Sequence, residues 1–547
     1  MHKYVVVLGF FLTNFVSPAQ SFEPEAPLDI PLVLSGTFAE LRSNHFHGGI
    51  DIKTQGRSGL KVKSISDGYI SRISISPYGY GNALYVRHPE GYTSVYGHLM
   101  TFAPAIEQWV EQTLRDRGKN DGNLYPDANL FPVEKGEFIA FSGNTGGSMG
   151  PHLHFEIRDT RTEEPLNPLS FGFKVEDTRR PDVRGLMWTD ADFQDHGTFS
   201  SGDTIEMSGT RGFDVFTTDK QNGANNNNGV YKLKAQINGI EFFSALYDRI
   251  NFNTTRYINA HMNFERYYHQ GVRYTRLYTL ENNELQLCQT PEVLESGYRA
   301  SNGWITMNKD SIAKVDISIE DFAGNESTVH FYLKGTAVED KPSNDLNILQ
   351  WDVDNVLSVG PIQVSIPAGA LYRDTEFKTF ELRDAEYVIG QGVVPLQKHM
   401  ELSWQLDSAR AAHEGWFAWE LGRNGNKDAI TGKREGNVLV LSTRSTGTYY
   451  LDQDLKKPVL RLVQSTPMLR SGSTYREYRI HVEDDKTGIE RYSARIDEAF
   501  ARIDFDYKRN LLKVVIPEDI EPGSHNLRIV AIDGVGNTAT ETFTVTL

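Results

Sequence analysis

Short runs in which apolar and polar residues alternate, separated by turns rich in glycine, extend over most of this chain. Residues 60–65 and 83–86 are examples in the first third, and residues 362–366 repeat the pattern further on. Alternation with a period of two places the apolar side chains on one face of a strand, and glycine turns join successive strands into antiparallel pairs. The sequence therefore predicts a mainly β fold built from antiparallel sheets.

Two distant segments of the chain resemble each other. Residues 315–325 and 527–537 both alternate and then end in Asp-x-x-Gly-Asn, and each is followed by a second alternating run, 329–333 and 542–547. This repeat predicts the same β-hairpin in two separate domains. The spacing resembles the last hairpin of bacterial immunoglobulin-like β-sandwiches, without the cysteine pair of antibody domains.

The length of 547 residues predicts three or four domains, at roughly 100–200 residues per domain. We place an antiparallel β domain at residues 20–177, with a helical insertion at about 101–134. An immunoglobulin-like β-sandwich follows at 178–340, a strand-rich β domain at 341–455, and a second immunoglobulin-like β-sandwich at 456–547.

One segment has helical rather than strand periodicity, and we predict an amphipathic helix at residues 103–117. Its apolar and small side chains recur at i, i+3, i+4, i+7 and i+8, namely Ile106, Trp109, Val110, Thr113 and Leu114, with Glu107, Glu111, Arg115 and Asp116 between them. We favour an apolar stripe that docks on its own domain; the alternative is a helix that binds a partner.

The first residues predict export. His2 and Lys3 precede an apolar run at 4–16, and Ser17-Pro18-Ala19 supplies small residues for cleavage, which is the pattern of a signal peptide over residues 1–19. An uncleaved anchor is the alternative, but the run is shorter than the roughly 20 residues of a spanning helix, and no later segment is long and apolar enough. The chain is therefore expected to be periplasmic, secreted or on the cell surface.

Charge and cysteine content exclude several kinds of site. The chain has 56 Lys and Arg against 72 Asp and Glu, a formal charge of −16, and no basic stripe, which argues against a nucleic-acid partner. Because Cys288 is the single cysteine, neither an intrachain disulfide nor a thiol-rich metal cluster can form. A metal site in this chain must use histidines and carboxylates.

Two motifs supply such ligands, His47-Gly48-Gly49-Ile50-Asp51 and His152-Leu153-His154. Side chains at i and i+2 of a strand point to the same face, so both histidines of the second motif can face one site. Two histidines and one carboxylate are the ligands of a zinc site that keeps one position open for water.

The residues around these motifs resemble peptidase family M23, the lysostaphin-like or LytM-like zinc metalloendopeptidases that hydrolyse peptidoglycan. The resemblance covers residues 47–156 and rests on His47-x-Gly49-x-Asp51, Gly59-x-x-Val62-x5-Gly68-x-Ile70, Gly81-Asn82-Ala83-Leu84-Tyr85-Val86-x-His88, Tyr96-Gly97-His98-Leu99 and Gly143-x-Thr145-Gly146-x-Ser148-x-Gly150-Pro151-His152-Leu153-His154-Phe155-Glu156. It implies one Zn²⁺ held by His47, Asp51 and His154. The segment 101–134 is longer than the corresponding connection in the family.

The resemblance also implies that His98 and His152 line the site without binding the metal. Two imidazoles that change charge near neutral pH can divide the roles of base and oxyanion donor, and we assign His152 as base and His98 as donor. Glu156 either orients His154 or is a solvated strand residue. His45 is a weaker alternative to His47 as a ligand, and His88 is expected to lie away from the substrate.

These observations predict an exported zinc metalloendopeptidase of a bacterium that cuts peptidoglycan stem peptides or cross-bridges. One alternative is a non-catalytic wall-binding protein or an activator of another wall hydrolase. Another is an adhesin or scaffold whose hydrolase domain is accessory, with the later modules binding wall or protein partners. A serine hydrolase is excluded, because the Gly146-x-Ser148-x-Gly150 motif precedes a strand rather than the helix that a nucleophile elbow requires.

Overall fold

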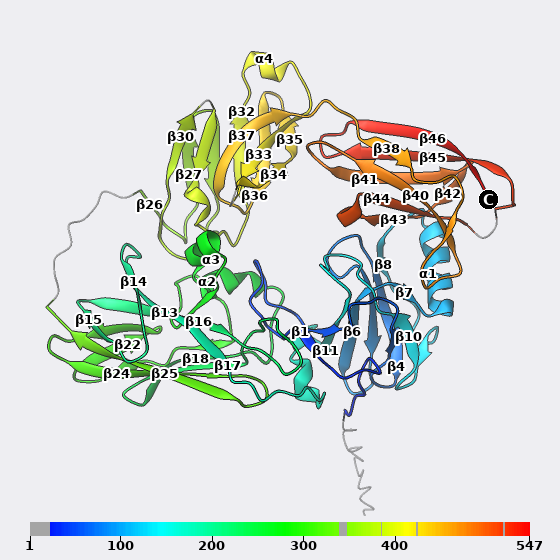
Figure 1. Ribbon diagram of the computed structural model, residues 1–547. Helices are drawn as coiled ribbons and strands as arrows, with labels where there is room; N and C mark the ends of the chain where they lie inside the picture. Colours follow the sequence, from blue (N-terminus) through cyan, green and yellow to red (C-terminus); the bar gives the residue numbers. More distant parts are fainter. Residues whose placement is uncertain (1–21, 338–346, 384, 423–424, 518–519) are drawn as a thin grey trace, which may run out of the picture.

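The computed structural model describes residues 22–337, 347–383, 385–422, 425–517 and 520–547. Their strands form four units, arranged in a ring in which the last unit returns to contact the first (Figure 1). Nearly all strand pairs are antiparallel, so the predicted mainly β fold is confirmed. No helix among the described residues is long and apolar enough to cross a membrane. The predicted signal peptide and the predicted boundary at 340/341 lie outside the described residues.

The first unit is a large antiparallel sheet that carries a smaller one. The large sheet has the order β1-β2-β11-β6-β5-β4-β8, with β12 beside β11 and β9 beside β4; the small sheet has the order β3-β10-β7. The strands are β1 (Leu34–Gly36), β2 (Ile50–Lys53), β3 (Lys61–Lys63), β4 (Gly68–Ile75), β5 (Asn82–Arg87), β6 (Tyr92–Leu99), β7 (Thr101–Phe102), β8 (Gly122–Leu124), β9 (Pro132–Val133), β10 (Phe138–Phe141), β11 (His152–Asp159) and β12 (Pro165–Leu166).

The second unit begins after the short helix η1 (Pro168–Phe171) and consists of two sheets that share a core with the first unit. Its strands are β13 (Asp182–Asp190), β14 (His196–Phe199), β15 (Thr204–Met207), β16 (Thr210–Thr218), β17 (Lys232–Ile237), β18 (Ile240–Leu246), β19 (Tyr274–Arg276), β20 (Cys288–Gln289), β21 (Val293–Leu294), β22 (Tyr298–Ser301), β23 (Trp304–Met307), β24 (Ile312–Glu320) and β25 (Glu326–Gly335), with η2 (Thr255–Tyr257), α2 (Ile258–His261) and α3 (Phe264–Gln270) between β18 and β19. The hairpin predicted from the first repeat is β24–β25.

The third unit has two five-stranded sheets and a two-stranded one around a separate core. Its elements are β26 (Ile348–Leu349), β27 (Asn355–Val359), β28 (Ile362–Ile366), β29 (Thr375–Glu376), β30 (Thr379–Arg383), β31 (Glu386–Ile389), η3 (Gly390–Gly392), β32 (Met400–Gln405), α4 (Ser408–Ala411), β33 (Trp416–Leu421), β34 (Lys427–Ile430), β35 (Gly432–Glu435), β36 (Val438–Thr443) and β37 (Gly447–Gln453).

The fourth unit is a sandwich of two sheets that enclose one core. Its elements are β38 (Val459–Leu462), β39 (Met468–Leu469), β40 (Arg476–Glu483), β41 (Ile489–Ile496), β42 (Ala499–Ala501), β43 (Ile503–Asp506), η5 (Tyr507–Arg509), β44 (Leu511–Val515), β45 (Ser524–Asp533) and β46 (Thr538–Thr546). The second predicted hairpin is β45–β46, so both copies of the repeat fold alike.

The predicted amphipathic helix is α1 (Pro104–Asp116), with proline in its first turn. Ile106, Val110 and Leu114 are buried against the first unit, as the periodicity predicts. Glu107 and Glu111, which the pattern places among the polar positions, are also buried. The helix is therefore covered on two sides, by its own unit and by the fourth.

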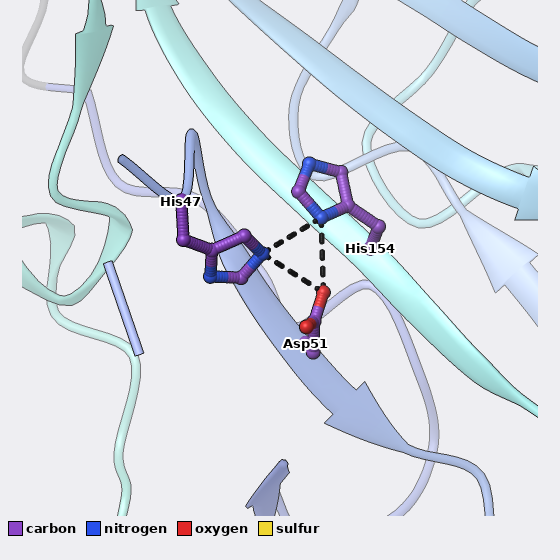
Figure 2. Close-up of side chains that lie close together, drawn as sticks. All are labelled: His47, Asp51 and His154. Carbon is purple, nitrogen blue, oxygen red and sulfur yellow. Dashed lines mark hydrogen bonds and ion pairs between the residues drawn. The ribbon is translucent and has the colours of Figure 1, made fainter. Parts of the chain in front are cut away.

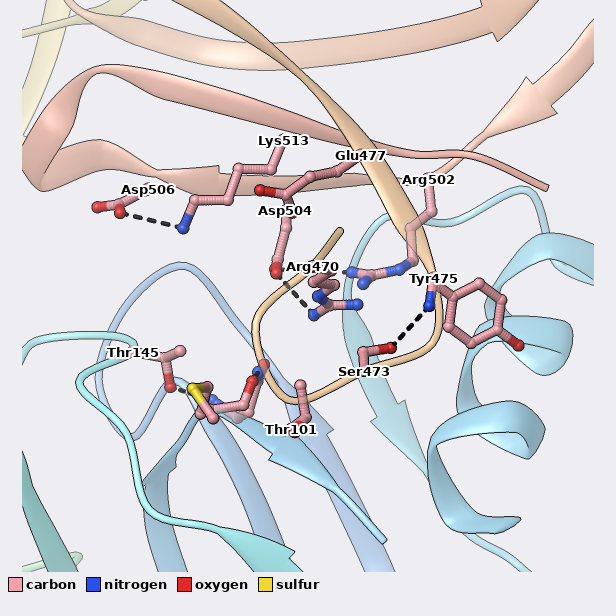
Figure 3. Close-up of polar contacts among 12 residues, drawn as sticks. Thr101, Thr145, Arg470, Ser473, Tyr475, Glu477, Arg502, Asp504, Asp506 and Lys513 are labelled. Carbon is pink, nitrogen blue, oxygen red and sulfur yellow. Dashed lines mark hydrogen bonds and ion pairs between the residues drawn. The ribbon is translucent and has the colours of Figure 1, made fainter. Parts of the chain in front are cut away.

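The fourth unit covers α1 through a buried cluster of charges. Arg470 contacts Glu111 at 2.7 Å and Glu107 at 3.2 Å, and Arg502 contacts Glu111 at 2.6 Å. Asp504 contacts Arg470 at 2.9 Å, a pair that Figure 3 shows beside the helix. Burial opposes ionisation of Glu111, but the charges of Arg502 and Arg470 outweigh it and lower its pKa. These ion pairs close the ring.

Replacing Glu111 with glutamine leaves the buried guanidinium groups of Arg470 and Arg502 short of negative charge. Breaking one partner out of a buried pair costs about 3–5 kcal/mol. We therefore expect E111Q to lower the first midpoint in calorimetric unfolding, whereas E206Q, which removes the exposed partner of Lys334, changes it little. Equal midpoints for E111Q and the unmodified protein would contradict the structural role of the cluster.

Candidate metal centre and active site

The three predicted metal ligands lie together in the first unit. Asp51 of β2 and His154 of β11 are directly opposite each other in an antiparallel pair, and His47 lies just before β2. His47 Nε2 is 3.1 Å from both Asp51 Oδ1 and His154 Nδ1, and His154 Nδ1 is 2.9 Å from Asp51 Oδ1 (Figure 2). All three residues are buried. The structure therefore brings together the two sequence motifs that supply these ligands.

Two glycines of the family motifs permit this approach. A Cβ at Gly49 would lie 2.2 Å from the carbonyl oxygen of Phe155, so a side chain there would push β2 away from β11. Gly97 pairs with His154 from the other side, and a Cβ there would lie 3.3 Å from the His154 Cβ. The glycines in HxGxD and in Tyr-Gly-His thus keep the backbone close to the ligands.

Hydrogen bonds set which nitrogen of each histidine faces the cluster. His47 Nδ1 donates to the carbonyl oxygen of Thr37 at 2.7 Å, and His154 Nε2 donates to Glu156 Oε1 at 2.8 Å. The opposite nitrogens, His47 Nε2 and His154 Nδ1, then present lone pairs toward Asp51 Oδ1. Three acceptors within 3.1 Å of one another repel unless a cation lies between them. Two imidazoles and one carboxylate are a donor set that suits Zn²⁺.

The cluster also attracts protons. Burial opposes ionisation of Asp51, but the neighbouring histidines outweigh burial and hold its pKa well below the usual range. Burial likewise opposes protonation of His154, yet hydrogen bonds with Asp51 and Glu156 raise its pKa to about 9. A metal ion must therefore compete with a proton for His154 Nδ1.

Behind His154 lies a buried chain of supporting groups. Glu156 Oε2 accepts from Arg158 at 2.6 Å, and its Oε1 also accepts from the Tyr80 hydroxyl at 2.6 Å. Tyr80 stacks on the His154 ring with centroids 5.0 Å apart. Burial opposes ionisation of Glu156, but Arg158 and His154 lower its pKa to about 2. Of the two interpretations of Glu156, the structure supports the one in which it orients His154.

His98 and His152 flank the ligand cluster, with ring centroids 4.7 Å apart. His98 Nδ1 donates to the carbonyl oxygen of Thr145 at 2.8 Å, and His152 Nδ1 donates to that of Gly150 at 2.9 Å. His152 Nε2 is 3.4 Å from Asp51 Oδ1. Both rings thus leave Nε2 available. Burial and the charges of His154 and His152 lower the pKa of His98 to about 3, so its ring is neutral at physiological pH.

The backbone at His98 supports a functional role for this residue. Its φ is +56°, in the left-handed region that residues with a side chain seldom adopt. Such conformations persist where surrounding structure enforces them, and they cluster at active sites.

Two other histidines lie away from the cluster. His45, the alternative ligand, is exposed and bonds to the carbonyl oxygen of Ser43. His88 is buried, with Nδ1 on the carbonyl oxygen of Asp67 and Nε2 on Ser94. Ser148 contacts His152 Nδ1 at 3.2 Å and is followed by strand β11 rather than by a helix.

Four supporting residues were absent from our sequence interpretation. Tyr80 and Arg158 hold Glu156, and Arg42 donates to Asp51 Oδ2 at 3.1 Å. Lys508 of the fourth unit donates to the carbonyl oxygens of Asn144 and Ser148, at 2.7 and 2.9 Å. Because alternate residues of a strand share a face, the position of Arg158 beside Glu156 and His154 could have been predicted from the sequence. Nothing local marks the others.

Glu156→Gln removes the negative charge that His154 and Arg158 share. Loss of a carboxylate behind a ligating histidine typically weakens metal binding about 10–100-fold. We expect that loss of Zn²⁺ affinity in competition with a chromogenic chelator. E163Q is the matched control, because Glu163 contacts Arg158 at 3.5 Å but is exposed and away from His154. Equal affinities for the two variants would contradict the role of Glu156.

The raised pKa of His154 makes metal binding dependent on pH. Below about 9 the ring carries a proton that Zn²⁺ must displace, so the apparent affinity rises as pH increases toward that value and then levels off. One displaced proton gives about a tenfold change per pH unit. Chelator competition at several pH values measures the slope, and a flat profile between about pH 6 and 8 would contradict this assignment.

Comparisons with known proteins agree with the geometry. Residues 45–114 match the model of peptidase family M23, and residues 346–454 match that of the Zu5-like domain. The DD-carboxypeptidase/endopeptidase Mpg of Neisseria meningitidis serogroup B is 32% identical over 142 residues, which are 26% of this chain and 26% of that protein. An uncharacterized metalloprotease of Haemophilus influenzae is 32% identical over 121 residues, 22% of this chain and 20% of that protein.

Among solved structures, the catalytic domain of the antimicrobial peptidase lysostaphin from Staphylococcus simulans is 24% identical, with 26% of this chain and 91% of that chain covered and a TM-score of 0.20. The match to the Neisseria protein spans about a quarter of the length of that relative. The family model matches residues of the first unit, where the motif series and the ligand cluster lie. Residues 45–114, which lie in the first unit, are thus similar to peptidase family M23.

Proposed function

We propose that this protein is an exported zinc metalloendopeptidase that hydrolyses peptide bonds in peptidoglycan stem peptides or cross-bridges. The observation that carries the proposal is the convergence of His47 Nε2, Asp51 Oδ1 and His154 Nδ1 within 3.1 Å, while the other ring nitrogens of the two histidines are bonded to Thr37 and Glu156. The similarity of residues 45–114 to peptidase family M23 supports the proposed reaction class.

These three atoms would hold Zn²⁺. Bound there, Zn²⁺ lowers the pKa of a water molecule toward ~7 and polarises the scissile carbonyl. His152 Nε2, adjacent to Asp51, is placed to accept a proton from the attacking water and return it to the leaving amine. His98 faces the same space, but its neutral ring keeps its hydrogen on Nδ1 toward the carbonyl oxygen of Thr145, so its Nε2 is an acceptor. The role of oxyanion donor that we assign to His98 would require the tautomer with the hydrogen on Nε2.

The substrate class is inferred from the relatives and from the resemblance of the motifs. The Neisseria protein is named a DD-carboxypeptidase/endopeptidase, an activity on peptides that contain D-residues. The signal-peptide pattern at residues 1–19 supports a periplasmic, secreted or cell-surface location, where peptidoglycan is accessible.

The fourth unit forms part of the surroundings of the site. A pocket is lined by Asn144, Thr145 and Pro151 of the first unit, the last of which precedes His152 in the chain, and by Tyr507 and Lys508 of the fourth. We propose that the units after the first position the wall polymer, or a partner bound to it, at this pocket. A non-catalytic wall-binding role is not favoured, because all three ligands and both flanking histidines are in place.

Variants separate metal binding from turnover. We expect H47A and D51A to lose both zinc and hydrolysis, whereas H98A and H152A keep about one zinc per chain and lose about 10²–10⁴-fold in rate. Metal analysis by mass spectrometry, beside mass spectrometry of the muropeptides released from purified peptidoglycan, measures both properties and identifies the bond that is cut.

H45A is the matched control, since His45 is exposed two residues before the first ligand. It should retain zinc and full activity. Stoichiometric zinc in H47A would overturn the ligand assignment, and intact muropeptides after incubation with the zinc-loaded protein would overturn the proposed activity.

A further inference from the structure

Two groups of three aspartates lie at corresponding places in the second and fourth units. The first acidic cluster is Asp177, Asp219 and Asp321; the second acidic cluster is Asp454, Asp484 and Asp533. Within each cluster, one carboxylate oxygen from each aspartate lies within 4.8 Å of the others. Four of the six side chains lie below a tenth of full exposure, namely Asp219, Asp321, Asp454 and Asp533, and Asp177 and Asp484 are partly exposed.

The two clusters are built from the same parts of the fold. One aspartate, Asp177 or Asp454, belongs to the segment that enters the unit before its first strand, β13 or β38. The second aspartate comes directly after a strand: Asp219 follows β16, and Asp484 follows β40. The third, Asp321 or Asp533, begins the Asp-x-x-Gly-Asn turn that the sequence repeats.

The asparagine of that turn ties the third aspartate to the first. Asn325 Nδ2 donates to Asp321 Oδ2 at 2.8 Å and to the carbonyl oxygen of Asp177 at 3.4 Å. Asn537 Nδ2 donates to Asp533 Oδ2 at 2.8 Å and to the carbonyl oxygen of Asp454 at 3.1 Å. The repeated motif therefore does more than close a hairpin: in both units it draws the entering segment against the turn.

The carboxylates lack positive partners. Among the described residues, no Lys, Arg or His forms an ion pair with any of the six aspartates. Asp219 is 3% exposed, and its Oδ1 is buried with no hydrogen-bond partner; Asp484 Oδ1 is also buried without one. An isolated buried carboxylate is costly unless it is protonated or paired with a cation.

The charges within the first cluster act on one another. Burial, together with the charges of Asp321 and Asp177, raises the pKa of Asp219 to about 7, against the smaller effect of Arg179. In the second cluster, burial and the charges of Asp454 and Asp533 raise the pKa of Asp484. The charges of the other two aspartates and burial thus outweigh the hydrogen bond from the Lys220 backbone and the charge of Arg179 at Asp219.

From this geometry we infer that each acidic cluster binds one Ca²⁺ ion. The ligand atoms of each cluster are carboxylate oxygens, which suit a hard cation rather than zinc, since zinc prefers nitrogen and sulfur ligands. Ca²⁺ accepts irregular sets of six to eight oxygens, whereas Mg²⁺ requires a near-ideal octahedron, and ligands from three separate segments suit the former. These sites are distinct from the histidine centre of the first unit.

The sites lie at two of the junctions of the ring. Asp177 lies in the segment between the first and second units, and Asp454 lies in the segment between the third and fourth. A Ca²⁺ ion at each place ties the entering segment to two loops of the unit that follows. Calcium would thereby fix the direction in which each immunoglobulin-like unit leaves its neighbour.

Equilibrium dialysis of the zinc-loaded full-length protein against ⁴⁵Ca²⁺ tests the inference. We expect two Ca²⁺ per chain, with dissociation constants on the order of 10⁻⁴–10⁻³ M as in extracellular calcium modules. D219N and D484N should each bind one, and the double variant none. D248N, at an exposed aspartate of the second unit, and D485N, next to Asp484, are the controls, because neither residue belongs to a cluster; both variants should bind two.

Calcium should also raise the thermal unfolding midpoint of the unmodified protein, and this shift should disappear in the double variant, while zinc content stays the same. Absence of bound Ca²⁺ in the unmodified protein would overturn the inference whatever the variants do. So would saturation by Mg²⁺ alone, or full Ca²⁺ binding by the double variant. If the clusters are instead kept neutral by protons, D219N gives the same midpoint with and without Ca²⁺, and so does the unmodified protein.

Discussion

The antiparallel pairing of β2 with β11 is the constraint on which the site depends. It sets Asp51 directly opposite His154, although the two strands are far apart in the sequence. A slip of one residue in this pairing would turn one of the two side chains to the other face of the sheet. Gly49 and Gly97 let the chain approach β11 closely on both sides, since a Cβ would clash at Gly49 and make a tight contact at Gly97. The chemistry therefore rests on backbone contacts as much as on the ligands.

Support for the site extends outward in layers of charge. His154 is hydrogen-bonded to Glu156, and Glu156 accepts a hydrogen bond from Arg158. A negative group therefore supports the ligand, and a positive group supports that negative group. On the other side of the site, the Ser148 and Gly150 turn that holds His152 is itself held by Lys508 of the fourth unit. A residue 356 positions from His152 in the chain thus touches the loop that orients it, and the two ends of the protein share one functional region.

The sequence predicts which residues lie close together where their spacing along one strand or motif determines it. Residues on one strand or in one short motif, such as His152 and His154 or the two Asp-x-x-Gly-Asn turns, lie as periodicity predicts. The helix at 104–116 was also predictable, but its burial was not. Glu107 and Glu111 were interpreted as polar positions, and their partners Arg470 and Arg502 lie in a unit that no local pattern connects to the helix. Contacts of this kind depend on how whole units pack, which periodicity does not encode.

Closure of the ring has a mechanical consequence. The first and second units share one core, whereas the third and fourth each have a core of their own. The contact of Arg470 and Arg502 with α1 gives the fourth unit a second attachment, in addition to its connection through the third unit. A displacement of the fourth unit would therefore also act, through Lys508, on the turn that carries His152.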